Sequence, residues 1–347
     1  MSGDISKYIG HNQWDGLNFD KFYNKAITGD YEKIILFCQN EWAWHVQGDP
    51  VLFEKLQSFC EENNKLIYII TGSAELCYPV AIKNTVISWW NTYWIGKTLG
   101  ALFNINNRKI LSIGSYDKVE YKYHYISMNN RPHNHRCLLI DLLAKNKLLD
   151  YGAVSLHQLP VPEMYTWRYF DAKPLLLESE FPEDKNQYRI TEQYYESFAQ
   201  LISESSADTI ILSEKTAIPL LLGKPFLVAS QMHYHKFLKS LGFELFEEIF
   251  DYSFDDEPDE EKRYEMLLEN FTRLVQIPKQ ELYTLQLKIA HKLEFNKKHA
   301  KAIPYDMSTY PELAIETINW YKDTGNVLDH QLISDYENLE MHKGFEI

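Results

Sequence analysis

The sequence predicts an α/β protein made of two units, each built around a parallel sheet, that face each other across a cleft. The chain has 347 residues, which is too long for one ordinary hydrophobic core and indicates two domains. Short apolar runs alternate with amphipathic helical patterns, a spacing typical of strand–helix–strand units. We place the domains at residues 1–120 and 121–305, and we expect a helical segment at 306–347 to pack back across both.

The first unit is predicted to alternate strands with at least one helix. VLFEKLQSFCEEN, at residues 51–63, places Leu52, Phe53, Leu56 and Phe59 on one helical face. The predicted strands are short apolar runs: KIILFC at 33–38, KLIYIITGS at 65–73, TVISWWNTYW at 85–94 and KILSIG at 109–114. In parallel sheets the functional loops follow the carboxyl ends of such strands.

The second unit begins near Lys122 and is predicted to alternate in the same way. Gly223 is expected to stop a short helix, and a long amphipathic helix carries the stripe Leu282, Leu285, Ile289 and Leu293. Its predicted strands are residues 122–128, 208–213 and 224–230. Its predicted helices are residues 137–150, 190–205, 217–223, 280–302 and 311–323.

The bulk composition argues against several classes of protein. The net charge is −14, so a general electrostatic affinity for nucleic acid or acidic membranes is not expected. The four cysteines lack the spacing of a zinc site or a disulfide framework, which favours a reducing compartment. No apolar run is as long as a membrane span. We therefore expect a soluble protein of the cytoplasm, with no membrane partner.

The first polar stretch that indicates chemistry is MNNRPHNHR, at residues 128–136, between a predicted strand and a predicted helix. Such junctions bind phosphates because free backbone N–H groups and the helix dipole both attract anions. The candidate ligand-binding residues are Asn129, Arg131, His133, His135 and Arg136. The alternative is a solvated loop with Asn134 as the helix cap. His133 and His135, two residues apart and without a nearby carboxylate, are weak evidence for a metal site, so no metal site is predicted.

The second polar stretch is the triplet Glu214, Lys215 and Thr216, which precedes the apolar run AIPLLLG. At a strand-to-helix junction, the carboxylate can accept hydrogen bonds from a sugar diol, and the ammonium and hydroxyl groups can bind phosphate. The alternative is a surface ion pair of little energetic value beside a threonine cap. In the acidic stretch at 251–263, predicted to be largely solvated, Asp251 and Arg263 are the candidates for reaching the cleft.

Three stretches, in order along the chain, match the motifs of one enzyme family. YISMNNRPHNHRCLLIDLLAKNKLLDYG, at 125–152, looks like its strand, loop, Arg-led helix and D-x-G ending. TIILSEKTAIPLLLGKPFLVAS, at 209–230, looks like its TEK, apolar helix, Gly and Pro-led strand. LKSLGFELFEEIFDYSFDD, at 238–256, is similar to the L-R-x-L-G-F-x-T-F and D-E-S-Y-D of viral members. The chain thus resembles the donor domain of α1,3-fucosyltransferase-like enzymes, and more closely the fucosyltransferase- and exostosin-like glycosyltransferases of phages and giant viruses.

The resemblance implies a GT-B fold, in which two Rossmann-like domains enclose a nucleoside-diphosphate sugar. By position, Arg136 matches the arginine that contacts the donor diphosphate, and Glu214 and Lys215 match the pair that holds its ribose and phosphates. The implied transfer to a hydroxyl acceptor is inverting and needs no metal or further cofactor, because cationic side chains and helix N-termini stabilise the leaving diphosphate. Met128-Asn129 replaces the family's Ser-Asn, so the donor sugar stays open.

The resemblance also implies a catalytic base from the N-terminal domain, within hydrogen-bond reach of the acceptor hydroxyl. Glu41 is the first candidate, because it follows a predicted strand and lies near Trp42 and Trp44, which can stack on a sugar; Asp117 is the second. The acceptor classes are a glycan, a small molecule or a hydroxylated base of phage DNA, the last disfavoured by the net charge. The alternative function is non-catalytic nucleotide or glycan binding on a glycosyltransferase scaffold.

Overall fold

The computed structural model describes residues 8–12, 19–29, 31, 33–38, 50–71, 85–89, 120–156, 191–207 and 209–302. The chain divides into two compact units. The first comprises Met1–Gly96 with Ile303–Ile347, and the second comprises Lys97–Ala302. Both contain parallel sheets with helices, so the protein is of the α/β class.

The first unit contains what we call the first sheet, whose described strands are parallel and follow the order β1-β2-β3-β4. Its strands are β1 (Tyr8–Asn12), β2 (Lys33–Cys38), β3 (Leu66–Thr71) and β4 (Thr85–Trp89). Helices α1 (Phe19–Thr28) and α3 (Pro50–Glu62) contact each other. The predictions for β2, α3, β3 and β4 are confirmed, whereas β1 and α1 were not predicted. The predicted strand 109–114 lies outside the described residues.

The core of the first unit is apolar because the strand runs and one face of each helix supply aliphatic and aromatic side chains. Its buried members are Phe22, Ala26, Ile34, Leu36, Leu56, Cys60 and Ile67. Ile34 and Ile67 are register partners on β2 and β3, so the sheet brings them together. Burial raises the pKa of the Cys60 thiol to about 11, which makes it a packing group rather than a reactive one.

The second unit contains the second sheet, which is also parallel but follows the order β6-β5-β7-β8. Its strands are β5 (Tyr123–Asn129), β6 (Gly152–Leu156), β7 (Ser197–Ser203) and β8 (Phe226–Ala229). From β5 the chain moves outward to β6 on one side and later returns to β7 on the other side. The strand order therefore reverses between β5 and β7, which is the topological switch point of the sheet.

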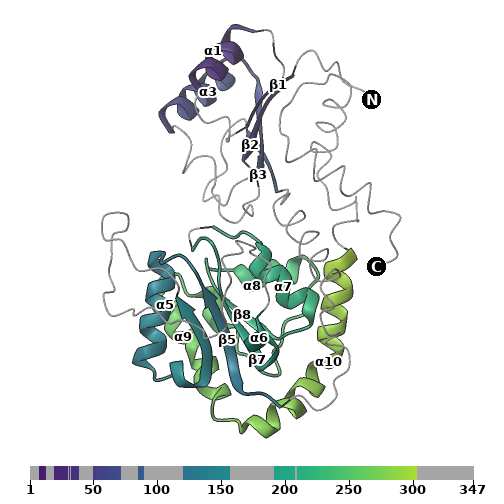
Figure 1. Ribbon diagram of the computed structural model, residues 1–347. Coiled ribbons are helices and arrows are strands. Elements are labelled where there is room, and N and C mark those ends of the chain that lie inside the picture. Colours follow the sequence, from purple (N-terminus) through teal and green to yellow (C-terminus); the bar gives the residue numbers. More distant parts are fainter. Residues whose placement is uncertain are drawn as a thin grey trace. The chain divides into compact units, whose positions relative to one another are not determined.

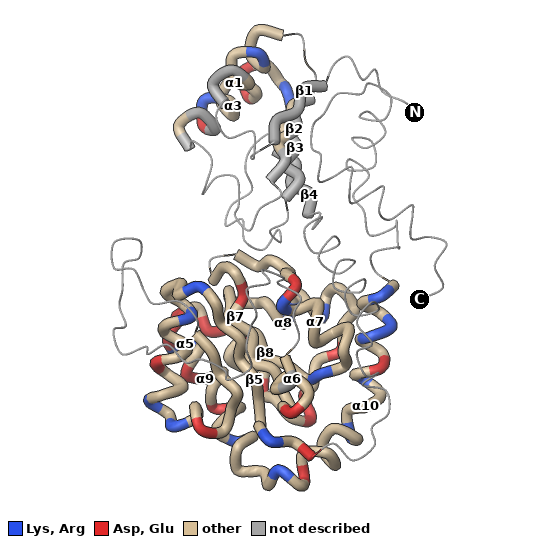
Figure 2. Tube along the Cα trace, viewed as in Figure 1, with Lys and Arg blue, Asp and Glu red and all other residues tan. Residues whose placement is uncertain are grey.

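Helices cover both faces of the second sheet, as Figure 1 shows. Helices α5 (Asn134–Lys145) and α9 (Glu260–Leu274) contact each other on one face, and α7 (Glu214–Leu222) and α10 (Lys279–Ala302) do so on the other. The shorter elements are α6 (Glu192–Tyr195), α8 (Tyr234–Ser240), η4 (Leu149–Tyr151) and η5 (Ser253–Asp256). The strands themselves contain no Lys, Arg, Asp or Glu, so the charge of this unit lies in helices and loops (Figure 2).

The predicted helix at residues 190–205 is wrong for most of its length. Only α6 is helical there, and Ser197–Ser203 form strand β7. Tyr194, Phe198 and Leu201 are spaced as on a helical face, but every residue of β7 is buried. A central strand of a parallel sheet is covered on both faces, so its side chains are apolar or small in both directions and its period of two is lost.

The predicted strand at residues 208–213 is also wrong, because Thr209–Ser213 form a loop. Ile210, Ile211 and Leu212 are buried there, and a short buried run looks the same in sequence whether it is strand or loop. Both edges of β7 are already occupied, by β5 and β8. The Glu214 triplet therefore follows a loop, and the preceding strand ends eleven residues before Glu214, at Ser203.

The other predictions for the second unit are confirmed where the structure describes the chain. They concern β5, α5, α7, β8 and α10. Gly223 ends α7 in the left-handed region with φ 67°, and Leu282, Ile289 and Leu293 of α10 are buried while Leu285 is half-buried. The predicted helix 311–323 and the segment 306–347 lie outside the described residues.

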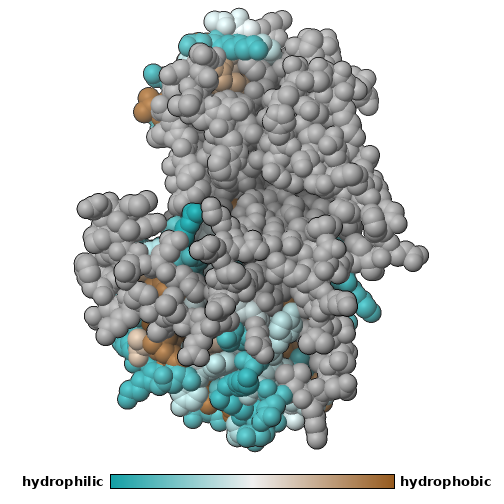
Figure 3. Space-filling view, viewed as in Figure 1, coloured by the Kyte–Doolittle hydropathy of each residue, from teal (hydrophilic) through white to brown (hydrophobic). Residues whose placement is uncertain are grey.

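The described surface of the second unit is largely hydrophilic on the face shown in Figure 3, with small separate hydrophobic areas. Among the described residues of this unit, the exposed large apolar side chains are Tyr151, Leu287 and Phe295. Scattered apolar residues of this kind are normal on a globular surface. Within the described ranges, no helix combines the length and the apolar character that crossing a membrane requires.

Candidate functional site

The candidate site lies at the carboxyl edge of the second sheet, between β5 and β7. In open α/β sheets, ligands bind outside the carboxyl ends of the strands where the strand order reverses. Here β5 ends at Asn129 and β7 ends at Ser203. The segments that follow these two ends contain most of the polar residues singled out from the sequence.

The first segment runs from the end of β5 into α5. Asn129 is 2% exposed, its backbone N–H donates to Ser155 Oγ at 3.2 Å, and its Nδ2 donates to Ser127 Oγ at 3.1 Å. The Oδ1 atom of Asn129 is buried without a hydrogen-bonding partner among the described residues. Arg131 is exposed, and the N-cap of α5 is His133 rather than Asn134; the His133 side chain makes no capping bond.

Two side chains from the first turn of α5 reach across to the segment after β7. The His135 Nε2–H donates to the backbone carbonyl of Glu204 at 2.8 Å, and Arg136 Nη2 donates to the same oxygen at 3.1 Å. Arg136 Nη1 also donates to the carbonyl of Arg131 at 3.2 Å. Since a carbonyl only accepts, the hydrogen bond fixes the proton of His135 on Nε2. These bonds fasten the two segments together over the switch point.

Glu204 is the central buried group of this edge, and it was not predicted. Its side chain is fully buried. The carboxylate accepts hydrogen bonds from two backbone N–H groups, those of Ser205 (3.1 Å) and Ser213 (3.4 Å). It also accepts hydrogen bonds from three hydroxyl groups: Ser213 Oγ (2.5 Å), Thr216 Oγ1 (2.7 Å) and Tyr234 OH (3.0 Å). A buried carboxylate is tolerated when its lone pairs are filled in this way. The signal in the sequence is a lone glutamate directly after an apolar run, which the wrong helix at 190–205 concealed.

The triplet after Ser213 is joined to this network. Ser213 caps α7, because its Oγ accepts from the N–H of Lys215 at 3.2 Å, so the cap is not Thr216. Lys215 Nζ lies 3.0 Å from both Glu214 Oε1 and Ser205 Oγ. Glu214 is only 7% exposed, so this is not the surface ion pair considered as the alternative. Thr216 is fully buried, and its hydroxyl is bound by Glu204 and Tyr234 rather than directed to a ligand.

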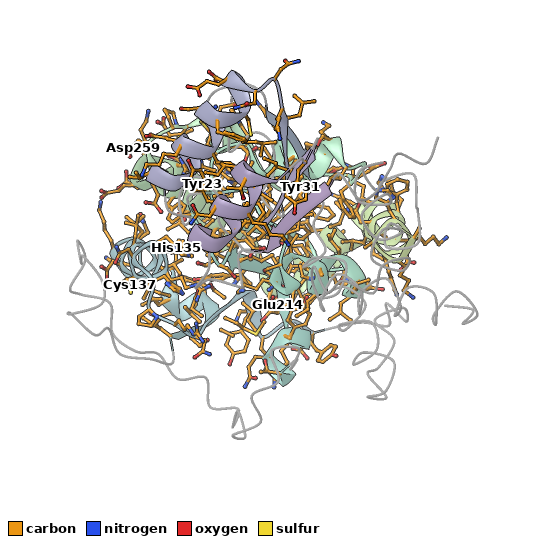
Figure 4. The ribbon with its side chains drawn as sticks, turned by 90° about the horizontal axis from the view of Figure 1, so that it is seen from above. Tyr23, Tyr31, His135, Cys137, Glu214 and Asp259 are labelled. Atoms are coloured by element: carbon orange, nitrogen blue, oxygen red, sulfur yellow. The ribbon has the colours of Figure 1, made fainter. Side chains whose placement is uncertain are left out.

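The site brings several cationic groups around His133. Burial, followed by the positive charges of Arg136, Arg131 and Lys215 in that order, lowers the pKa of His133 to about 4. Burial and then Arg136 lower the pKa of His135 to about 3. The two imidazole rings stack with their centroids 5.7 Å apart. Both rings are therefore neutral near pH 7, in a positive local potential within a protein of net charge −14. His135 and Glu214 belong to the first turns of α5 and α7 (Figure 4).

The two candidates from the acidic stretch are placed differently. Arg263 is buried at the carboxyl edge, where its Nε donates to the carbonyl of Ser230, just after β8, at 3.0 Å. Asp251 is exposed, and its backbone groups form hydrogen bonds with the side chain of Asn270 on α9. Its carboxylate accepts from the N–H of Ser253, which lowers its pKa. The structure therefore does not bring Asp251 to the Glu204 network.

A buried hydrogen bond between a histidine and a carboxylate, also not predicted, fixes the segment after β8. His235 Nδ1 donates to Asp255 Oδ1 at 3.0 Å, and His235 Nε2 accepts from the N–H of Val228 at 3.1 Å. Burial alone would raise the pKa of Asp255, but hydrogen bonds from His235 and from the N–H of Lys236 lower it. Both nitrogens of the ring are occupied by the protein, so the pair holds α8 against β8 rather than acting on a ligand.

The structure does not describe the two residues that the sequence analysis offered as the catalytic base. Glu41 and Asp117, the candidate bases, lie outside the described residues, as do Trp42 and Trp44. Within the described ranges no group of three or more His, Cys, Asp or Glu side chains is arranged to hold a metal ion. The chemistry that the described site offers is anion binding by Arg131, Arg136 and Lys215, with the carboxylate of Glu214 beside them.

Comparisons with known proteins give no relative: no protein-family model, no curated protein and no solved structure matches this chain.

Proposed function

We propose that the chain is a glycosyltransferase that moves a sugar from a nucleoside-diphosphate sugar to a hydroxyl acceptor. The observation that carries the proposal is the convergence of Arg131, Arg136 and Lys215 at the switch point of the second sheet. A diphosphate is the ligand that such a group matches best, because arginine forks and backbone N–H groups bind phosphate oxygens. The whole chain has a net charge of −14, so this group of positive charges is a local feature and does not reflect the overall composition.

The proposed roles follow from how each side chain is held. Arg136 is buried and bonded to two carbonyls, so its guanidinium is held in one orientation at the carboxyl edge and supplies a fixed positive charge for a phosphate. Lys215 is held by Glu214 and Ser205 and supplies a point charge for the second phosphate. The Glu214 carboxylate accepts hydrogen bonds from the ribose diol. Preorganised cations of this kind stabilise the leaving diphosphate as charge develops on it.

The rest of the mechanism is proposed from the family resemblance. The two units form a GT-B arrangement, with the donor in the second unit and the acceptor side in the first. Inversion at the sugar carbon requires a base that removes the proton of the acceptor hydroxyl, and Glu41 or Asp117 is proposed for that role. The acceptor is a glycan, a small molecule or a hydroxylated DNA base.

The experiment is a thermal-shift screen with UDP-, GDP- and CMP-sugars, because a ligand that binds only the native state raises the melting temperature. We expect at least one of these to stabilise the protein, and we expect Lys215→Met to abolish that shift. Lys288→Met is the matched control, since Lys288 is an exposed lysine on α10. A complete absence of shift across the panel contradicts the proposal.

Turnover separates an enzyme from a binding protein. The stabilising nucleotide sugar is incubated with the chain and a panel of glycans, small hydroxylated acceptors and hydroxymethylated DNA, and nucleotide release is followed. We expect release that Lys215→Met abolishes, and that one of the two variants Glu41→Gln and Asp117→Asn also abolishes. Binding without release in any combination favours the non-catalytic alternative. An absent gel shift on plain and modified DNA at low salt removes DNA from the acceptors.

A further inference from the structure

His133 occupies a particular position in the candidate site. It is the N-cap of α5 and is half-buried, and its backbone N–H donates to the carbonyl of Arg131 at 3.0 Å. The guanidinium of Arg136 is bonded to that same carbonyl, so it lies beside the His133 loop. Lys215 approaches from α7 on the other side of the switch point. Three cations therefore act on the ring, of which Arg131 and Arg136 belong to its own segment and Lys215 belongs to α7.

We propose that His133 takes up one proton from solvent when the phosphates of a nucleotide sugar bind, and so becomes an additional cation of the occupied site. This inference rests on the proposed function and deepens it. It goes beyond binding because it assigns a change of protonation to one residue, and it predicts how affinity changes with pH.

The physical reason is that the free site penalises a charged ring, whereas the occupied site favours it. In the free protein, burial and the positive charges of the three cations hold the pKa of His133 at about 4. A bound diphosphate among the same cations cancels their repulsion and adds an attraction of opposite sign. The imidazole then binds a proton at a pH where it was neutral before. The proton comes from the buffer, and no bond other than the new N–H is made or broken.

The other titratable groups around the ring are already engaged. On α5, His135 is 8% exposed, and its Nε2–H is held by the carbonyl of Glu204. The Glu204 carboxylate has all its donors within the protein, and Glu214 on α7 pairs with Lys215. From α9, Tyr264 is fully buried, and burial raises its pKa well above the ordinary value. We therefore assign the proton uptake that accompanies anion binding to His133, where the positive charges of Arg136, Arg131 and Lys215 act.

Proton uptake by His133 fixes the direction in which the affinity for the nucleotide sugar changes with pH. If the complex binds more protons than the free protein, affinity rises as the pH falls, between the pKa of His133 in the complex and its lower pKa in the free protein. The limiting slope is about tenfold in affinity per pH unit for one proton. A nucleotide sugar is a suitable probe because its diphosphate is substituted at both ends. It therefore lacks the monoester group whose second pKa of about 6 would confuse the measurement.

The first test is isothermal titration calorimetry of the full chain with UDP-glucose and GDP-mannose, near pH 6, in two buffers of different ionisation enthalpy. We expect the apparent binding enthalpy to differ between the buffers by an amount that corresponds to uptake of up to one proton. We expect His133→Gln to bind with no such difference, and His291→Gln, a control at an exposed histidine of α10, to behave as the unmodified chain. Binding without buffer dependence, or uptake that persists in His133→Gln, overturns the inference and leaves the proposed function standing.

The second test removes the nucleotide. The pKa of His133 is measured by NMR of histidine-labelled protein with and without sulfate, whose charge is constant across this pH range, using His133→Gln to assign the signal. We expect sulfate to raise the pKa of His133 and to leave that of His291 unchanged. A rise with sulfate but no binding of any nucleotide sugar contradicts the proposed function while the linkage at His133 holds. No rise with sulfate contradicts the linkage.

Discussion

The two sheets use the same parallel architecture but bury different chemistry. Among the side chains that the structure describes, the buried residues of the first unit are all apolar or cysteine, as in Phe22, Ile34 and Leu56. The second unit buries Glu204, Arg136 and many other polar groups. The described strands of the first sheet run in chain order, whereas the second sheet reverses between β5 and β7. Buried charge therefore accompanies the strand reversal.

The comparison teaches why one parallel sheet can serve as a scaffold while the other provides a site. At a reversal, the connections from two neighbouring strands leave in opposite directions, and the space between them is lined by loop backbone and polar side chains. Those groups must be paired, because an unpaired buried polar group is costly. In this chain Glu204 performs that pairing. Four predictions test the contrast, in order of expected effect.

The largest effect is expected for Glu204→Ala. The substitution removes the acceptor of the hydroxyls of Ser213, Thr216 and Tyr234, which stay buried. We expect a loss of roughly 3–5 kcal/mol in the unfolding free energy of the second unit, since each unsatisfied buried donor costs about 1–3 kcal/mol. Hydrogen exchange of β7 amides measures the loss, with β3 amides as the reference in the first unit. Glu204→Gln, which keeps one acceptor oxygen, should lose less, and equal exchange in all three proteins contradicts the central role of Glu204.

The next effect concerns a lysine with a buried ammonium group. Lys224 Nζ donates to the carbonyl of Ser197 and lies 4.7 Å from the ring centroid of Tyr194, and burial lowers its pKa to about 7 from 10.5. Between about pH 7 and 10.5 the unfolded chain holds a proton that the folded chain lacks. The unfolding free energy therefore rises with pH in that interval, by at most roughly 1.4 kcal/mol per unit.

Lys224→Met should remove this pH dependence and make the protein more stable than the unmodified chain below about pH 7, where the buried ammonium is fully charged. Urea unfolding at one pH below and one pH above that value measures the change. Lys65→Met is the matched control for a lysine above an aromatic ring, since Lys65 Nζ lies 5.5 Å from the ring centroid of Phe59 in the first unit. A slope that survives in Lys224→Met shows that another group causes it.

A smaller effect is expected for Gly152→Ala, where an added Cβ would lie 2.4 Å from the ring of Tyr125. Tyr125 is fully buried, and its hydroxyl donates to the carbonyl of Leu148, so the ring cannot move freely. We expect a loss of about 1–3 kcal/mol, the usual cost of overpacking. Gly29→Ala in the first unit meets the ring of Tyr31 in the same way, but that ring is half-buried and can turn aside. Urea unfolding should show a larger loss for Gly152→Ala, and equal losses would remove this difference between the units.

The smallest effect is expected at the surface. Lys145 on α5 pairs with Glu265 on α9 at 2.9 Å, and their side chains are 66% and 45% exposed. Exposed pairs of this kind add little to stability because water screens them. Lys145→Ala should leave the melting temperature unchanged within error. A clear decrease would mean that the contact between α5 and α9 depends on charge rather than on packing.

Much of the fold could be predicted from local patterns. The apolar run of β2, the helical stripe of α10 and the glycine that ends α7 were read correctly, because each depends on neighbours along the chain. The strand β7 could not be found in this way. Its residues are buried on both faces, so the alternation that marks a strand is absent, and the pairing that creates it involves residues far away in the sequence.

The candidate site was predicted in part for the same reason. The sequence indicated the loop with Arg131 and Arg136 and the segment with Lys215, because clusters of polar residues next to apolar runs are visible locally. Glu204 was missed, and Asp251 was included although the structure places it with Asn270. Which polar residues meet depends on the order of the strands, and a local pattern does not contain that order.

The sequence by itself therefore determined the α/β class and the polar segments that follow the strands, because alternation of apolar and polar residues is a local property. Only the tertiary structure decided that β7 lies between β5 and β8, that the strand order reverses beside it, and that Glu204 joins α5, α7 and α8 at that edge. These features follow from burial on both faces of a central strand and from hydrogen bonds between residues distant along the chain.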